Sequence, residues 1–371
     1  MRRILSVFVI AGAVLAAARA GTSPAPTPSR TPPSARLQLP RDSPSHASHP
    51  DATLEWWYWT GHLRSDDGRA YGFQLTFFRL RDLHLAHFAW SDIGGGTFAF
   101  AQKTHLGLPG IAGASASHLD AFNEDWFARE VEQRRASPFA GKQVLLHARG
   151  PSGMGELSLT LTPEKPPVLH GENGISRKGA GPDDYSHYVS ITRLAASGTW
   201  TAEGRTRSLH GDAWFDHEWG PGGLPAGVQG WDWFALQLSD GSELMLYRMR
   251  TANGGGASPF SAGTFVPKTG APTPISWKDV RLEPRTRWTS PHSKATYPAV
   301  WSLAIASLSL DVTITPLLAD QELSTAESTG VTYWEGACKV EGARAGSPVG
   351  GRAYVEMTGY AGRDVPGFSA P

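Results

Sequence analysis

Cysteine is almost absent from this chain of 371 residues, because Cys338 is the only one. A single cysteine excludes an internal disulfide, so packing alone must hold the fold together. The residues around it, EGACKVEG, do not resemble a known reactive setting. We therefore expect Cys338 to be a buried and inert thiol.

An excess of charge of either sign is also missing, since 34 Lys and Arg stand against 34 Asp and Glu. Balanced charge gives no field that attracts nucleic acid, and we predict no nucleic-acid partner. It does not indicate membrane contact either. The sequence also lacks a Gly-x-Ser-x-Gly elbow, a phosphate loop, a dinucleotide fingerprint and a Cys-x-x-Cys pair, and we predict no cofactor. A Ser/His/Asp hydrolase stays open, because such triads assemble in space.

The first twenty residues, MRRILSVFVIAGAVLAAARA, have the layout of a secretory signal peptide. A basic start precedes an apolar run over 4–18, and the small residues Ala18 and Ala20 suit cleavage after Ala20. The apolar run is shorter than the roughly 20 residues of a membrane span. We expect export to the periplasm or the extracellular space.

Residues 21–50 are rich in Pro, Ser and Thr, and we interpret them as a disordered linker before a folded part that begins near Asp51. From there on, short runs of Trp, Tyr, Phe, Val and Thr alternate with turn signals at 65–68 and 239–241. This spacing predicts antiparallel sheets closed into barrels or sandwiches. Only residues 118–135 could form a short helix.

Two stretches of the sequence resemble each other. Residues 57–79 and 231–250 both show Trp-x-Trp, a strand, an Asp-Gly turn and a second strand. The match needs a shift of one residue, and many hairpins share part of this pattern. Alone it favours two similar halves only weakly.

The stretch GDAWFDHEWG, residues 211–220, concentrates ionisable side chains among aromatic ones. In a regular strand Asp212, Asp216 and Glu218 share one face with Trp214, while His217 and Trp219 share the other. Carboxylates and imidazole then point in opposite directions, which is a poor zinc set, and we predict no metal site. We interpret the stretch as a junction between barrels, in which His217 lines a site. Asp212, Asp216 and Glu218 are then structural.

Asp232 in QGWDWFALQL shares a strand face with Phe234, Leu236 and Leu238. An acid on an apolar face has two interpretations. A protonated carboxyl group in an apolar cavity could donate a proton to a substrate. The alternative is a buried Asp that is bonded to the backbone or to an Arg.

Fourteen Trp residues supply flat apolar surfaces that suit a hydrophobic ligand or a developing cation. In LEWWYWTGHL, Glu55 shares a face with Trp57 and Trp59, and Trp56 and Tyr58 lie opposite. Packing in a barrel core is the alternative for most of these rings. The predicted ligand-binding residues are Glu55, Trp57, Tyr58, Trp59, Trp214, Trp231 and Trp233.

Six motifs together resemble one family. They are HPDATLEWWYWTGHL, GRAYGFQLTFFR, HGDAWFDHEWG, GWDWFALQLSDGSELMLYRMR, TYWEGACKVEG and GRAYVEMTGY. In this order, over about residues 49–361, they resemble the carotenoid 1,2-hydratase and AttH-like secreted protein family.

This resemblance implies two lipocalin-like barrel domains in tandem, over residues 51–225 and 226–371. It also implies hydration of a terminal carotenoid double bond by an Asp acid with His, Trp and Tyr nearby, without an organic cofactor. Carried over to this chain, these roles fall on His217, Trp219 and Asp232. The expected Tyr is missing, since Gly230 stands two residues before the acid.

We therefore expect an exported protein that binds an isoprenoid, polyene or lipid-like molecule and hydrates an alkene. In this hypothesis Asp232 donates the proton, Trp faces stabilise the carbocation and His217 positions or deprotonates the water. A carrier of an apolar ligand without catalysis is the alternative, and an exported hydrolase is the third hypothesis. The sequence does not predict an oligomeric state.

Overall fold

The computed structural model of this chain describes residues 46–132, 142–251 and 256–362. The predicted signal peptide and the predicted linker up to residue 45 lie outside the described residues. His46, Ala47 and Ser48 are buried, although the linker was predicted to extend to Pro50. The packed part of the chain therefore begins before the predicted start at Asp51.

The described residues form β-structure, and their only helices are the short 3-10 turns η2 (Trp277–Asp279) and η3 (Ala306–Leu308). The prediction of an all-β fold is thus confirmed. The short helix considered possible over 118–135 is not found in the described part of this stretch, 118–132, which contains β6 (Asp120–Asn123) and β7 (Trp126–Val131). Burial alternates with a period of two in both strands, and Glu124 turns the chain between them with φ of 54°.

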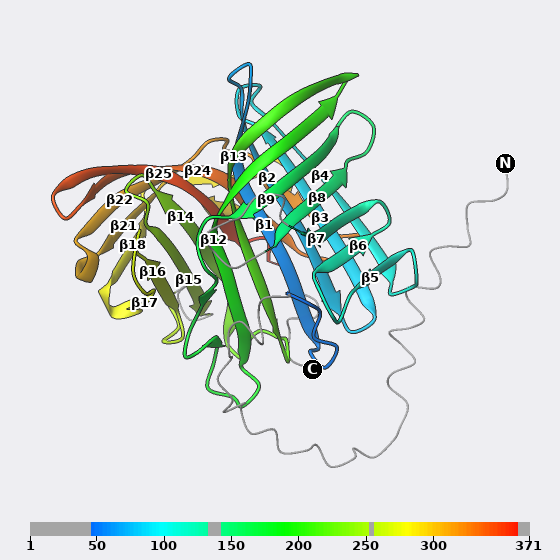
Figure 1. The fold of residues 1–371 in the computed structure, drawn as a ribbon. Coiled ribbons are helices and arrows are strands. Elements are labelled where there is room, and N and C mark those ends of the chain that lie inside the picture. Colours follow the sequence, from blue (N-terminus) through cyan, green and yellow to red (C-terminus); the bar gives the residue numbers. More distant parts are fainter. Residues whose placement is uncertain (1–45, 133–141, 252–255, 363–371) are drawn as a thin grey trace, which may run out of the picture. The chain divides into compact units, whose positions relative to one another are not determined.

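The first sheet holds thirteen of the described strands, all paired antiparallel. Along the sheet the main path runs β4-β3-β2-β1-β13-β12-β9-β8-β7-β6-β5. Its strands are coloured between blue, for β1, and green, for β13, in Figure 1. Besides β6 and β7, its strands are β1 (Leu54–Ser65), β2 (Ala70–Leu80), β3 (Leu83–Asp92), β4 (Thr97–Leu106), β5 (Ala112–Ala114), β8 (Gln143–Arg149), β9 (Glu156–Pro163), β10 (Val168–Leu169), β11 (Ile175–Arg177), β12 (Tyr185–Ala202) and β13 (Arg205–Gly220).

The second sheet holds ten of the described strands and follows the order β17-β16-β15-β14-β25-β24-β22-β21-β18, with β23 beside β24. Its strands are β14 (Val228–Leu238), β15 (Glu243–Thr251), β16 (Ala262–Val266), β17 (Thr273–Ser276), β18 (Val280–Pro284), β21 (Trp301–Ile305), β22 (Leu310–Pro316), β23 (Glu322–Ser324), β24 (Thr332–Arg344) and β25 (Ser347–Met357). A separate pair consists of β19 (Arg287–Thr289) and β20 (Thr296–Pro298).

The two similar hairpins occupy equivalent places. β1 and β2 begin the first sheet, and β1 also pairs with β13, the last strand of that sheet. β14 and β15 begin the second sheet, and β14 also pairs with β25, its last strand. The change from one sheet to the other falls in residues 221–227, between the end of β13 and the start of β14.

Each sheet covers a hydrophobic core of its own. Trp59, Phe73 and Phe88 are fully buried within the first, which curves into a near barrel. Phe234 and Trp301 belong to the core of the second. The two antiparallel sheets are the architecture that the fold prediction required, whereas the division into two domains stays a prediction. None of the described helices is long and apolar enough to cross a membrane.

Side chains of both sheets also pack against each other. Tyr58, Tyr188 and Trp214 of the first sheet form one cluster with Trp233 and Met245 of the second. Polar bonds join the sheets as well, among them one from the His62 imidazole to the Ala353 carbonyl over 3.0 Å and one from the Ser91 hydroxyl to Gln321 over 2.8 Å.

Candidate functional site

A cavity lies where the two sheets meet and has about 1060 Å³ of empty space, part of it open to solvent. Because this figure includes open solvent, it is an upper bound on the space that a bound molecule could fill. Aromatic rings form much of its wall, and five ionisable groups interrupt them. The rings include Trp56, Tyr58, Tyr188, Trp219, Trp231, Trp233, Tyr247 and Tyr333, and the ionisable groups are Lys178, Asp216, Glu218, Glu335 and Glu356.

The alternation of side chains along each strand decides which residues reach the cavity. On β1, Tyr58 lines the cavity while Trp57 packs in the core of the first sheet. On β13, Asp216 lines it while Phe215 packs in the same core. Each of these strands therefore serves the core with one face and the cavity with the other.

Asp216 is the best-organised acid in the cavity wall. Its carboxyl group accepts hydrogen bonds from the Tyr188 hydroxyl at 2.6 Å, from the Trp214 indole at 2.6 Å and from the Ser190 hydroxyl. Burial raises the pKa of Asp216 to about 7, although these three donors lower it. Near neutral pH a large share of Asp216 is thus protonated and able to donate a proton.

Glu356 on β25 is a second acid with an altered pKa. It accepts a hydrogen bond from the Trp231 indole at 2.9 Å. Burial raises the pKa of Glu356 to about 7, and the negative charges of Glu218 and Asp216 add to the effect. Burial also raises the pKa of Glu335 on β24 well above its ordinary value. The cavity therefore contains several carboxyl groups that keep their protons at pH values where a surface acid is ionised.

Lys178 places a cation in the same wall. Its ammonium group lies 3.1 Å from Glu218 and 4.2 Å from the centre of the Tyr247 ring. Burial lowers the pKa of Lys178, but the charge and hydrogen bond of Glu218 together with Tyr247 and Asp216 outweigh it, and the net shift is upward. Glu218 also accepts a hydrogen bond from the Ser186 hydroxyl at 2.6 Å. This pair can orient a polar end of a ligand while the rings contact its apolar part.

The predicted ligand-binding residues are divided between the cavity and the cores. Tyr58, Trp231 and Trp233 line the cavity, as does Trp219. Trp57 and Trp59 do not: they are 1% and 0% exposed and pack in the core of the first sheet, which was the alternative for these rings. Trp214 acts behind the wall as a donor to Asp216.

Asp232 has fixed partners instead of an apolar environment. The Arg248 guanidinium lies 2.6 Å from its carboxylate, Arg250 lies 3.5 Å away, and the Tyr360 hydroxyl donates to it at 2.8 Å. Asp232 is also absent from the cavity wall. Asp232 therefore has the bonds to Arg that the second interpretation expected, and its role as a proton donor stays a prediction. Arg248 is the cross-strand neighbour of Asp232 on β15, which the pattern of β14 alone cannot reveal.

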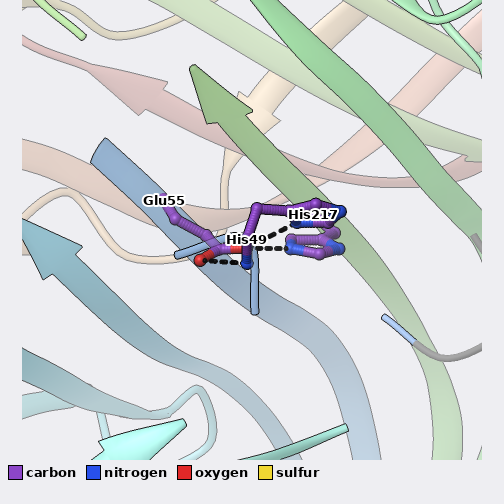
Figure 2. Close-up of side chains that lie close together, drawn as sticks. All are labelled: His49, Glu55 and His217. Carbon is purple, nitrogen blue, oxygen red and sulfur yellow. Dashed lines mark hydrogen bonds and ion pairs between the residues drawn. The ribbon is translucent and has the colours of Figure 1, made fainter. Parts of the chain in front are cut away.

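His217 also lies outside the cavity wall. Its Nε2 atom is 3.0 Å from Glu55 Oε1, and His49 Nδ1 is 2.9 Å from the same oxygen (Figure 2). Glu55, predicted to contact a ligand, belongs to this histidine cluster. Trp219 belongs both to the cavity wall and to the surroundings of the histidine cluster. It lines the cavity, and its ring stacks on the His49 ring with 3.8 Å between the ring centres.

The three acids of β13 differ in where their carboxylates lie. Asp212 forms an ion pair with Arg352 at 2.8 Å, as its structural interpretation requires. Asp216 and Glu218, predicted to be structural, lie in the cavity wall instead.

The sequence interpretation missed Lys178, Tyr188, Glu335 and Glu356. Glu335 and Glu356 did give a signal, because each is an acid in a strand with many apolar residues, as Asp232 is. Lys178 follows β11 in a loop, and its sequence shows no comparable signal.

A family model described as AttH-like matches residues 30–360. The crystal structure of a candidate AttH from Nitrosomonas europaea is 32% identical, with a TM-score of 0.78 over 88% of this chain and 98% of that chain. Kievitone hydratase from Nectria haematococca is 16% identical, with a TM-score of 0.68 over 84% and 91% of the two chains. This second likeness shows a shared fold alone. No sequence among the curated proteins matches this chain.

Proposed function

The chain belongs to the AttH-like family, and we propose that it binds an apolar, unsaturated molecule between its two sheets and hydrates an alkene there. The observation that supports this function best is Asp216, a buried acid in the wall of an aromatic cavity. A pKa of about 7 makes it a proton donor near neutral pH. Kievitone hydratase, which has the same fold, is a hydratase by name.

The proposed ligand is an isoprenoid, a polyene or a lipid-like molecule, carotenoid-like ligands included. The flat rings of Trp56, Trp231 and Trp233 offer contact surfaces for such a chain. Their electron-rich faces also attract a positive charge that forms on the ligand. The Lys178–Glu218 pair would hold a polar end group.

The reaction begins when the Asp216 O–H bond breaks and its proton forms a C–H bond with one alkene carbon. The second carbon becomes a carbocation, which the surrounding ring faces stabilise. A water oxygen then bonds to this carbon, and one of its protons passes to a carboxylate of the cavity, Asp216 itself or Glu356. The product is an alcohol with the mass of the alkene plus one water.

Asp216 thus takes the role that the sequence assigned to Asp232, and the water is activated without His217. Asp232 is held by Arg248, and the His217 imidazole is bonded to Glu55. Neither residue lines the cavity.

The test incubates the purified chain with a panel of acyclic polyenes, squalene among them, and follows the products by mass spectrometry in normal and ¹⁸O-labelled water. A product that gains one water and carries the label supports a hydratase. Asp216→Asn should lower the turnover by about 100-fold or more, because general acids contribute roughly 10²–10⁴. Asp212→Asn, on the same strand but paired with Arg352, serves as the control and keeps the wild-type rate.

The aromatic wall of the cavity also favours a second function, that of a carrier. Such a protein would bind the polyene and return it unchanged after long incubation. A ligand that is split into two fragments would instead indicate the exported hydrolase. Each outcome overturns the hydratase proposal.

Export is part of the proposal and depends on residues 1–20. Mass spectrometry of the chain recovered from outside the cytoplasm should find Gly21 at its N-terminus. A chain that keeps its first twenty residues inside the cell would contradict export.

A further inference from the structure

Three histidines and a glutamate gather on the face of β13 opposite to the acids of the cavity. Glu55 of β1 is 0% exposed, His217 of β13 is 1% exposed, and His46 is buried next to them. His49 closes the cluster from the segment before β1, and its side chain keeps 32% of its surface exposed. These groups have no part in the proposed hydration.

The three atoms that Figure 2 connects lie at distances close to those of a metal site. Glu55 Oε1 is 2.9 Å from His49 Nδ1 and 3.0 Å from His217 Nε2, and all three atoms lie within 4.8 Å of one another. A tetrahedral zinc ion with bonds of about 2.0–2.1 Å keeps its ligand atoms about 3.4 Å apart. Small movements of the carboxylate and the half-buried His49 would therefore admit an ion.

The imidazole rings agree with this geometry. Two imidazoles on one tetrahedral zinc ion have ring centres about 5 Å apart, given the same bond lengths. The ring centres of His49 and His217 are 5.4 Å apart, and those of His46 and His217 are 5.7 Å apart. The rings of His49 and His217 therefore meet at the Glu55 oxygen at about the spacing that one metal ion requires, and the His46 ring lies next to His217.

Neighbouring groups hold Glu55 in place through its other oxygen. Oε2 accepts a hydrogen bond from the Ser48 hydroxyl at 2.8 Å and lies 3.1 Å from Arg79 Nη2. Outer contacts of this kind orient the carboxylates that bind metals. Oε1 remains directed at His49 and His217.

His46 gives an independent observation. Among the described residues its buried Nδ1 atom has no hydrogen-bond partner, although a buried polar nitrogen normally has one. The main chain is fixed there, because the Trp57 indole donates to the His46 carbonyl at 2.8 Å. A water molecule bound to the metal would give this nitrogen a partner.

We propose that His49, Glu55 and His217 bind a divalent transition-metal ion, with Zn²⁺ as the best candidate and His46 beside it. Two imidazoles and one carboxylate form the ligand set of many catalytic zinc sites and of non-haem iron sites. The ion would tie the segment before β1 to β1 and β13. The prediction of no metal site considered only β13, whereas two of these ligands come from elsewhere in the chain.

The test titrates chelator-treated full-length protein with Zn²⁺, and with Co²⁺ as a probe whose visible absorption reports tetrahedral coordination. We expect one ion per chain and a higher melting temperature with Zn²⁺. His49→Gln should weaken Zn²⁺ binding at least about tenfold, because it removes a direct ligand. His292→Gln is the control, since His292 lies at the surface next to Asp320 and should leave the affinity unchanged.

Absence of saturable Zn²⁺ and Co²⁺ binding at micromolar concentration would overturn the proposal, as would equal affinities of His49→Gln and the wild type. His217→Gln tests the buried ligand, but it also removes a contact of the core. If that variant fails to fold, the half-buried His49 decides the question. No readout depends on a reaction, so the metal site and the hydratase proposal can fail separately.

Discussion

The Tyr188 hydroxyl donates a hydrogen bond to Asp216 over 2.6 Å, and this contact joins β12 to β13 at the wall of the cavity. The same hydroxyl accepts a hydrogen bond from the Trp233 indole of β14 at 2.9 Å. Trp233, on a strand of the second sheet, therefore orients the Tyr188 hydroxyl that donates to Asp216 of the first sheet. The protonation of Asp216 depends on the contact between the two sheets.

Tyr188→Phe should raise the pKa of Asp216 above its value of about 7, because the ionised carboxylate loses a donor. A hydrogen bond to a charged group contributes roughly 1.5–3 kcal/mol, which corresponds to a shift of about one to two pH units. The carboxyl titration, followed by ¹³C NMR with labelled Asp, measures the shift directly. In a hydratase assay, the alkaline limb of the pH–rate profile should move upward by the same amount.

Tyr247→Phe is the matched control for this experiment. Tyr247 lines the same cavity, but its hydroxyl contacts Ser176 at 2.9 Å and does not reach Asp216. It should leave the Asp216 titration in place. Equal titration curves for Tyr188→Phe and the wild type would show that Tyr188 does not control the acid.

Three buried histidines should make the contact between the sheets sensitive to acid. His87 bonds to the Tyr333 hydroxyl at 2.8 Å, and burial lowers its pKa to about 3. Burial likewise lowers the pKa of His170 to about 3 and that of His62 to about 4. In the unfolded chain these groups titrate near 6.5. Below that pH the unfolded state binds more protons, so the free energy of unfolding falls as the pH decreases from 6.5.

Asp216 and Glu356 have the opposite effect on how the free energy of unfolding depends on pH. Their folded pKa values of about 7 exceed their ordinary values, so the folded state binds more protons between about pH 4 and 7. Their contribution to stability is complete at low pH and is lost as the pH rises towards 7. A single profile of the wild type therefore mixes the two effects, and a histidine variant is needed to separate them.

His87→Gln should lower the slope of the unfolding free energy against pH by about 1.4 kcal/mol per unit between about pH 4 and 6, because one proton fewer is taken up on unfolding. Urea denaturation at several pH values measures this slope. The exposed His292, changed to Gln, should give a profile parallel to that of the wild type. Parallel profiles for His87→Gln would mean that His87 is protonated in the folded state.

Lys165→Met should destabilise the contact between the sheets by about 3 kcal/mol, because it breaks a buried ion pair. Lys165 Nζ lies 2.6 Å from Glu243 of the second sheet, which is 0% exposed and also binds Arg193. Lys339→Met is the control: its pair with Glu341 is equally short at 2.7 Å but exposed, and such pairs contribute about 0–1 kcal/mol. Urea denaturation compares them. If both variants lost the same free energy of unfolding, burial would not be what makes the Lys165–Glu243 pair important.

The all-β fold could be predicted from the sequence because side chains alternate between the two faces of a strand, and this period of two depends only on local backbone geometry. It assigns Trp57 and Tyr58 to opposite faces of β1 correctly, yet it does not reveal that the cavity lies on the side of Tyr58. That depends on the second sheet, which packs there through contacts distant in sequence. The helix considered possible over 118–135 does not form in the described part of that stretch, because a turn at Glu124 separates the two strands β6 and β7.

The histidine cluster shows a different limit of the sequence. His49 stands at the end of a Pro- and Ser-rich segment, whose average composition predicts a linker. Composition describes the segment as a whole, whereas the bond from His49 to Glu55 depends on one side chain. The sequence did not reveal the partner of Asp232 for a related reason. Its own strand is apolar, and its partner Arg248 lies on the neighbouring strand β15.

Asp232→Asn tests directly which role Asp232 has. The change leaves Arg248 and Arg250 without their carboxylate, and breaking a buried ion pair costs about 3–5 kcal/mol. Asp240→Asn, whose partner Arg344 lies 2.8 Å away in a pair about one third exposed, should cost less than about 1 kcal/mol. Turnover per folded molecule should stay within about twofold of the wild type in the Asp232 variant, measured below its melting temperature. A stable but inactive Asp232→Asn would return the role of the acid to Asp232 and remove it from Asp216.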